Sequence, residues 1–85
     1  MFLVQKIDTS MGILFPDSIE SYVFNDVDKA KEKFTELMKA EDEHYYNNHY
    51  TIQDRDERED SEYDFDIAWS YDDCEFGTLI RFEEV

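Results

Sequence analysis

Hydrophobic and polar residues alternate most regularly between residues 63 and 82 of the chain. The apolar positions of the first run are Tyr63, Phe65, Ile67, Trp69 and Tyr71. A polar break at residues 72–75 follows, and the second run has its inward positions at Phe76, Thr78, Ile80 and Phe82. Because successive side chains of a strand point to opposite faces, the two runs predict strands with one buried face each, joined as a hairpin.

The register of this hairpin follows from matching the two apolar faces across a four-residue loop. The matched pairs are Trp69 with Thr78, Ile67 with Ile80, and Phe65 with Phe82. This register places Asp66 opposite Arg81 on the other face, and it predicts a cross-strand pair between them.

The first 24 residues predict two further strands. Residues 2–8 are rich in strand-forming side chains, and residues 9–12 are expected to turn the chain. Residues 13–15 form a short apolar run, which we expect Pro16 and Asp17 to stop, and residues 19–24 read as the second strand.

A three-and-four spacing of apolar residues predicts one long helix over residues 26–46. These apolar positions are Val27, Ala30, Phe34, Leu37, Met38 and Tyr45. Asn25 is a suitable N-cap, and Asp26 and Asp28 place negative charge near the positive end of the helix dipole. Asn47 and Asn48 are a plausible stop.

The segment between the helix and the C-terminal hairpin is strongly polar. Tyr50 and Ile52 suggest a short third strand, whereas residues 54–62, DRDEREDSE, contain no apolar residue and predict a solvated loop. The fold class is therefore α+β: an antiparallel sheet of four to five strands with one long helix packed on one face, in the order β-β-α-(β)-β-β. We expect residues 1–85 to form a single domain.

Composition supports a folded domain with one core. The chain has 85 residues, 41% of them hydrophobic, and its aromatic side chains can each bury roughly 150 to 250 Å². The single cysteine, Cys74, cannot form an intramolecular disulfide, and no apolar run approaches the roughly 18 residues that span a bilayer. We therefore expect a cytoplasmic protein that does not contact membranes.

Charge is the most unusual property of the chain. Its 23 acidic and 8 basic residues give a net charge of −15, and residues 51–85 carry −10 of it. Such a potential repels nucleic acid and anionic membranes and accelerates encounter with basic proteins. The expected partner is a basic protein rather than nucleic acid itself.

No pattern predicts catalysis or a bound metal or cofactor. A calcium-binding loop from Asp54 would need a glycine where Glu59 stands. Glu41 and His44 have an i, i+3 spacing seen in carboxylate-bridged metal sites, but such sites need a second pair on another helix. The acids next to Cys74 favour its neutral thiol over a nucleophilic thiolate. We expect a protein that is not an enzyme, with no cofactor.

The acidic array itself is the candidate binding site. Its members are Asp54, Asp56, Glu57, Glu59, Asp60, Glu62, Asp64, Asp66 and Asp72. Carboxylates two positions apart on a strand share a face at a spacing of about 6.6 to 7 Å. A line of carboxylates on a rigid support is a substitute for phosphates in the basic groove of a nucleic-acid-processing enzyme. The sequence therefore suggests an inhibitor that mimics nucleic acid.

In size, charge and lack of catalytic motifs, the chain resembles the small acidic inhibitors that phages make against bacterial defence nucleases, including anti-CRISPR and anti-restriction proteins. This resemblance concerns overall character and implies a role for no particular residue. The alternative is a non-catalytic interaction or dimerisation domain, which uses an apolar sheet edge or helix face while its acids provide solubility.

Overall fold

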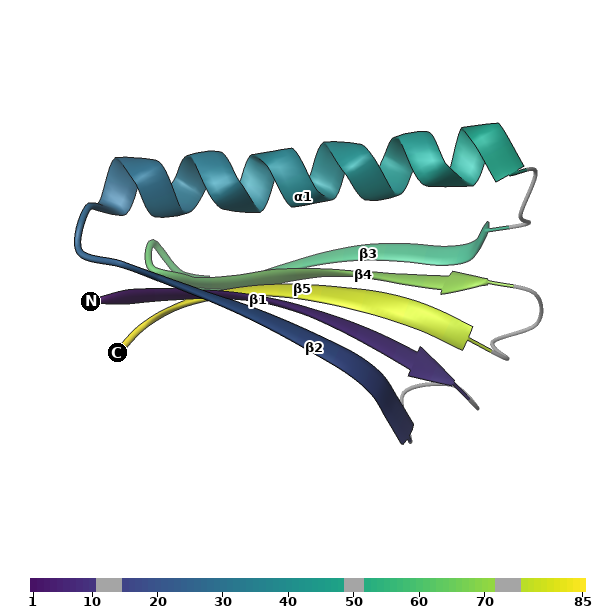
Figure 1. Ribbon diagram of the computed structural model, residues 1–85, viewed down its shortest axis with the longest axis horizontal. Coiled ribbons are helices and arrows are strands. Elements are labelled where there is room, and N and C mark those ends of the chain that lie inside the picture. Colours follow the sequence, from purple (N-terminus) through teal and green to yellow (C-terminus); the bar gives the residue numbers. More distant parts are fainter. Residues whose placement is uncertain (11–14, 49–51, 72–75) are drawn as a thin grey trace.

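The computed structural model describes residues 1–10, 15–48, 52–71 and 76–85 and has the expected α+β fold (Figure 1). Its elements are β1 (Phe2–Ser10), β2 (Phe15–Phe24), α1 (Val27–Asn48), β3 (Ile52–Ser61), β4 (Asp64–Tyr71) and β5 (Phe76–Glu84). No helix formed by these described residues is long and apolar enough to cross a membrane.

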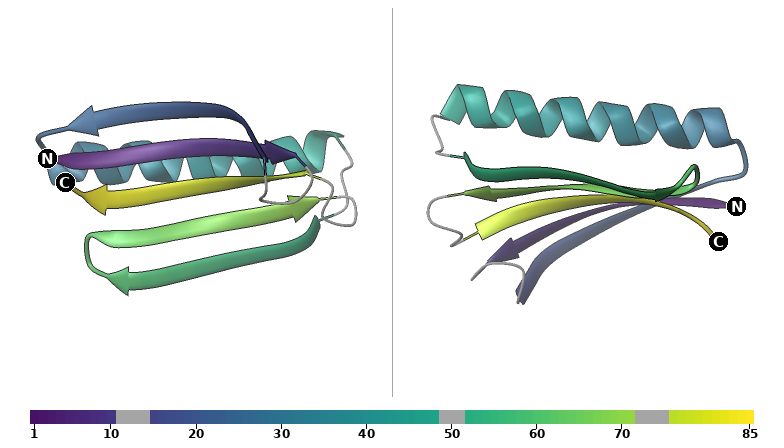
Figure 2. Two further views of the ribbon diagram at one scale, coloured as in Figure 1. Left: turned by 90° about the horizontal axis from the view of Figure 1, so that it is seen from below. Right: turned by 180° about the vertical axis from the view of Figure 1, so that it is seen from behind.

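The five strands form one antiparallel sheet in the order β2-β1-β5-β4-β3. The N-terminal strand β1 is an interior strand because it pairs with both β2 and the C-terminal strand β5, which is the central strand of the sheet. Strands β2 and β3 are the two edges. Helix α1 lies across one face of the sheet, and the described segments place no helix over the other face (Figure 2).

The core lies between α1 and the sheet. Its buried apolar side chains are Val4, Ala30, Phe34, Ile67, Trp69, Tyr71, Ile80 and Phe82. Phe65 stacks on Phe82 with 4.6 Å between ring centroids, and Phe34 from the helix meets Phe65 edge-on at 4.9 Å. These ring contacts hold the first half of α1 against β4 and β5.

The helix begins one residue later than its N-cap signal suggested. The Asp26 carboxylate accepts a hydrogen bond from the backbone N–H of Asp28, and the Asp26 carbonyl accepts the first helical bond from Ala30. Asp26, and not Asn25, is therefore the N-cap. The helix continues to Asn48, two residues beyond the predicted end.

The prediction of a loop at residues 54–62 is wrong, because Ile52–Ser61 forms strand β3. It pairs with β4 along its length, with irregularities between Ile52 and Asp54 and between Glu59 and Ser61. As an edge strand it needs no continuous apolar face, and charged side chains are typical of such edges.

Strand β2 is longer than the predicted strand at residues 19–24. It begins at Phe15 and includes Pro16, which was expected to end the preceding apolar run. Pro16 pairs with Thr9 next to a register shift at Asp8 and Thr9. Proline is tolerated there because β2 is an edge strand and its unpaired side needs no N–H donor.

The predicted β4–β5 register is confirmed at all three apolar pairs, and Asp66 lies opposite Arg81 as expected. The side chains of Asp66 and Arg81 nevertheless form ion pairs with other residues. Asp66 accepts a hydrogen bond from Arg58 of β3 at 2.8 Å, and Arg81 pairs with Glu83 at 3.2 Å. The register was therefore predictable from the apolar face, whereas the charge pairing depended on the unforeseen strand β3.

Candidate functional site

The predicted acidic array gathers mainly along β3 and the turn that joins it to β4. We use the name acidic edge for its exposed members, which are Asp56, Glu57, Glu59, Asp60, Glu62 and Asp64. Asp54 lies in β3 opposite Ser70. Asp72 lies outside the described residues.

Strand pairing divides the acidic edge between the two faces of the sheet. Glu57 lies opposite Ile67 and Glu59 opposite Phe65, so both belong to the face that carries α1. Asp56 lies opposite Ala68, on the face that points away from the helix. Carboxylates therefore flank the free edge of β3 on both sides.

Asp66 does not belong to the displayed set, although it shares a face with Asp64 as predicted. Its side chain is only 12% exposed and bonds to Arg58. This carboxylate, with the neighbouring acids Asp60 and Asp64, raises the pKa of Arg58. The Arg58–Asp66 pair thus joins β3 to β4, and it leaves the Asp66 carboxylate largely inaccessible to solvent.

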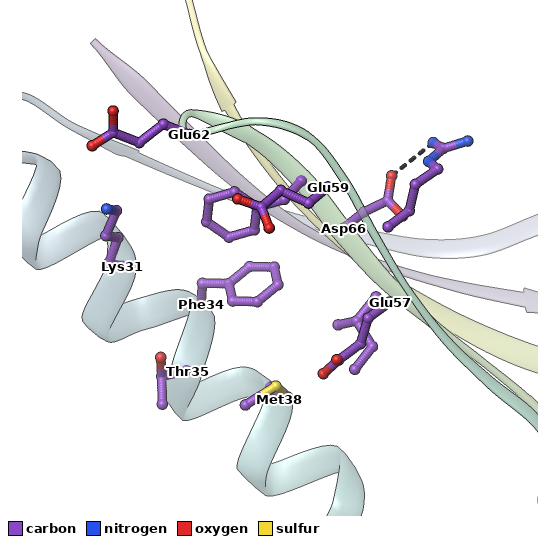
Figure 3. Close-up of a pocket in the computed structure, with 11 residues that line it drawn as sticks. Lys31, Phe34, Thr35, Met38, Glu57, Glu59, Glu62 and Asp66 are labelled. Carbon is purple, nitrogen blue, oxygen red and sulfur yellow. Dashed lines mark hydrogen bonds and ion pairs between the residues drawn. The ribbon is translucent and has the colours of Figure 1, made fainter.

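An open cavity of about 590 Å³ lies between α1 and the acidic edge (Figure 3). Its apolar lining comes from Phe34 and Met38 of the helix and from Phe65 and Ile67 of β4. Glu57, Glu59 and Glu62 line its outer side, with Lys31 on the helix. In Figure 3, Glu57 and Glu59 extend from β3 toward the helix, while Asp66 points away from the helix and pairs with Arg58.

The cavity combines an apolar lining with acidic side chains at its outer side, which matches the chemistry of a long cationic side chain. A lysine or arginine side chain has an apolar stem and a cationic head, and it buries the stem wherever the head keeps a polar partner. The cavity offers aromatic and aliphatic surface to the stem and carboxylates at its outer side to the head. The lining of this cavity is therefore chemically compatible with a long cationic side chain.

Asp42 fixes the position of β3 relative to the helix. Its carboxylate accepts two hydrogen bonds from Arg55 of β3, both 3.1 Å, and one from the Trp69 indole N–H at 2.9 Å. Partial burial alone would raise the pKa of Asp42, but the bonds from Arg55 and Trp69 and the charge of Arg55 hold it below its ordinary value. This contact ties the edge strand to α1, on one side of the cavity.

Glu41 fixes the neighbouring turn of the helix to the centre of the sheet. The buried Tyr71 hydroxyl donates a hydrogen bond to Glu41 Oε1, and Lys6 Nζ lies 4.0 Å from Oε2. Burial and the Glu41 carboxylate raise the pKa of Tyr71. Glu41 therefore holds the helix against the sheet. Within the described residues, no group of three His, Cys, Asp or Glu side chains is placed to hold a metal ion.

The charge of the molecule is unevenly placed. Residues 52–71, which include β3 and β4, contain eight acids and two arginines, whereas α1 contains four of the five lysines. Two of these lysines lie over aromatic rings, Lys31 over Tyr63 at 5.5 Å and Lys33 over Tyr22 at 4.4 Å. Negative charge is therefore concentrated on the β3–β4 hairpin.

Sequence reasoning identified the acids of the array but missed the cavity and the two helix acids that contact the sheet. Asp42 and Glu41 both lie among polar residues of the helix pattern, which suggested exposed positions. The available signal was spacing: Glu41 follows Phe34 and Leu37 at seven and four residues, so it continues the inward stripe.

Comparison of the chain with models of protein families, with curated proteins and with solved structures found no match.

Proposed function

We propose that this protein binds a basic nucleic-acid-binding groove of another protein and inhibits it by taking the place of the polynucleotide. The acidic edge is the binding surface. The observation that carries the proposal is the concentration of exposed carboxylates on one edge of a rigid sheet.

The charge density of this edge supports the proposal. Residues 54–64 hold seven acids and two arginines, a net charge of −5. Strand β3 runs seven steps of about 3.3 Å from Asp54 to Ser61, and the chain then turns, so that Asp64 lies opposite Ser61. The five net charges therefore lie along roughly 23 Å, or one per about 4.6 Å, which is about three quarters of the linear density of one DNA strand with its phosphate every 3.4 Å or so. Such an edge attracts a groove built for phosphates, while its lower charge limits self-repulsion.

The cavity adds a contact that phosphates do not offer. In this proposal, the aliphatic stem of an arginine or lysine from the partner groove packs against Phe34, Met38 and Phe65. Its cationic head pairs with Glu57, Glu59 or Glu62. Burial of the stem contributes affinity that salt does not screen, and it favours this protein over a plain polyanion. The proposed partner is therefore a nucleic-acid-processing enzyme with a mobile cationic side chain in its groove.

The test is affinity capture with two charge-matched variants. One variant carries Glu57→Gln, Glu59→Gln and Glu62→Gln in the acidic edge, and the control carries Glu32→Gln, Glu36→Gln and Glu43→Gln on exposed positions of α1. Immobilised wild-type protein and both variants are incubated with bacterial lysate at about 0.05 M and about 0.5 M salt.

We expect wild type and the helix variant to retain the same nucleic-acid-binding protein at low salt, and the acidic-edge variant to lose most of it. High salt should weaken capture, and an excess of duplex DNA should displace the captured protein. Equal capture by all three proteins, or a complex indifferent to both salt and DNA, would refute the proposed mechanism.

A further inference from the structure

No described segment covers the sheet face that points away from α1 (Figure 2). Phe2 and Val4 of β1 pack toward the helix, so Leu3, Gln5 and Ile7 lie on the opposite side. We use the name open face for this side of β1, β5 and residues 18–24 of β2. Its aliphatic side chains are Leu3, Ile7, Ile19, Val23 and Leu79.

Aliphatic side chains form two rows across the open face. One row joins Ile19, Ile7 and Leu79, and the other joins Val23 to Leu3. The two on the edge strand are the most exposed, with Ile19 at 57% and Val23 at 55%. The polar side chains of Ser21, Gln5 and Arg81 lie in a row between the two aliphatic rows. Exposed aliphatic side chains gathered on one face of a sheet are typical of a protein–protein interaction site.

Charge on the open face is balanced, in contrast to the rest of the molecule. Arg81 and Glu83 are its charged residues, and they pair with each other at 3.2 Å. A protein of net charge −15 thus keeps one surface on which charges balance, and the acids on this side of the sheet begin on the adjacent strand β4 with Asp64 and Asp66. A basic partner is drawn to the acidic edge instead, whereas a second copy of this chain meets no net repulsion here.

We infer that two copies of this protein pack face to face through their open faces, related by a two-fold axis that runs along β1. This axis places Ile7 against Ile7 of the other copy and Ile19 against Leu79 of the other copy. Sheets of known proteins stack in this aligned manner at a spacing of about 10 Å.

The same axis keeps the acidic edges apart. Strand β3 lies three strands from β1 in the sheet order, so a spacing of about 4.8 Å per strand separates the two acidic edges by roughly 30 Å across the dimer. This distance exceeds the Debye length of about 8 Å at physiological ionic strength. Dimerisation therefore leaves both acidic edges free for a partner.

The area predicts a weak, reversible dimer. The open face comprises nine residues of β1, nine of β5 and seven of β2, and it covers at most roughly 30 by 14 Å. This amounts to about 1,000 Å² or less buried over both copies once side-chain relief is included. That is near the lower limit for a specific interface, so we expect dissociation constants in the micromolar range.

The test is analytical ultracentrifugation of wild type, Ile19→Lys and the control Ala40→Lys, which adds the same charge at an exposed helix position. Wild type and the control should dimerise, and increased salt should leave the dimer unchanged or tighter. Ile19→Lys should raise the dissociation constant about 100-fold, because symmetry repeats the lost aliphatic contact in each copy. Circular dichroism checks that each variant is folded.

A mixing experiment tests the proposed axis. Ile19→Lys and Leu79→Glu should each be monomeric alone, and their mixture should form a heterodimer in which the lysine of one copy meets the glutamate of the other. A monomeric wild type at about 0.5 mM, an Ile19→Lys dimer as tight as wild type, or a mixture that stays monomeric would each overturn this inference.

Discussion

Asp42 offers the sharpest test of how the edge strand is held. Its carboxylate receives two bonds from Arg55 and one from Trp69, and both charged side chains are about one third exposed, at 34% for Asp42 and 35% for Arg55. Exposed ion pairs contribute about 0.2 to 1 kcal/mol, and the bidentate geometry places this pair near the upper value. The indole bond adds about 1 kcal/mol.

We therefore expect Asp42→Ala to lower the free energy of unfolding by about 2 kcal/mol, and Asp42→Asn by about 1 kcal/mol, because asparagine still accepts from the indole. Urea denaturation followed by circular dichroism measures both losses. With a slope of about 1 kcal/mol per molar urea for a small domain, Asp42→Ala should lower the midpoint by about 2 M.

A double-mutant cycle isolates the ion pair from the indole bond. Asp42→Ala and Arg55→Ala should show a coupling free energy of about 1 kcal/mol, while the exposed helical pair Lys33–Glu36 should show about 0.3 kcal/mol or less. A coupling no larger than that of the control pair would refute the role assigned to Asp42.

The acid dependence of the same contact has a fixed sign. Because the pKa of Asp42 is lowered in the folded protein, its contribution is present above the unfolded pKa of about 3.8 and is lost as pH falls through the folded value. The difference in stability between wild type and Asp42→Asn should therefore shrink below about pH 4. A difference that persisted unchanged in strong acid would contradict the assignment.

Substitutions at two residues test contacts in the middle of the sheet. Gly77→Ala should destabilise the fold by about 2 kcal/mol, or roughly 10 °C in thermal unfolding, because an added Cβ would lie 2.6 Å from the Trp69 carbonyl oxygen; an unchanged midpoint would argue against this close strand approach. Tyr71→Phe should cost about 1.5 to 3 kcal/mol in urea denaturation, because Glu41 stays buried without its hydroxyl donor. Since the pKa of Tyr71 is raised on folding, wild type should also lose stability above about pH 10, and this loss should be smaller in the phenylalanine variant.

The parts of the fold that the sequence predicted are those with a buried periodic face. Strands β4 and β5 alternate over eight and nine residues, so their register could be read directly. The helix was predicted to within two residues at both ends. The position of β1 between β2 and β5 was not predictable in this way, because pairing between the two ends of the chain leaves no local pattern.

Strand β3 was missed for a physical reason. An edge strand receives its backbone hydrogen bonds from one neighbour, and the side chains of β3 face solvent on one side and an open cavity on the other. Its sequence therefore carries no apolar alternation, and tertiary pairing with β4 overrides weak intrinsic preference. The acidic residues of the site were visible in the sequence, but their arrangement on a strand edge was not.

The acids of β3 have two physical consequences, and the acidic-edge variant separates them. Charges on an edge strand prevent other strands from pairing with it, so solubility alone would explain their presence. If that is their whole role, replacing Glu57, Glu59 and Glu62 by glutamine should promote aggregation and leave any captured partner in place. If the acidic edge binds a basic groove, the partner should be lost while light scattering still reports a soluble protein, because Asp56, Asp60 and Asp64 remain to protect the edge. The two measurements made on one variant therefore distinguish a soluble edge from a binding edge.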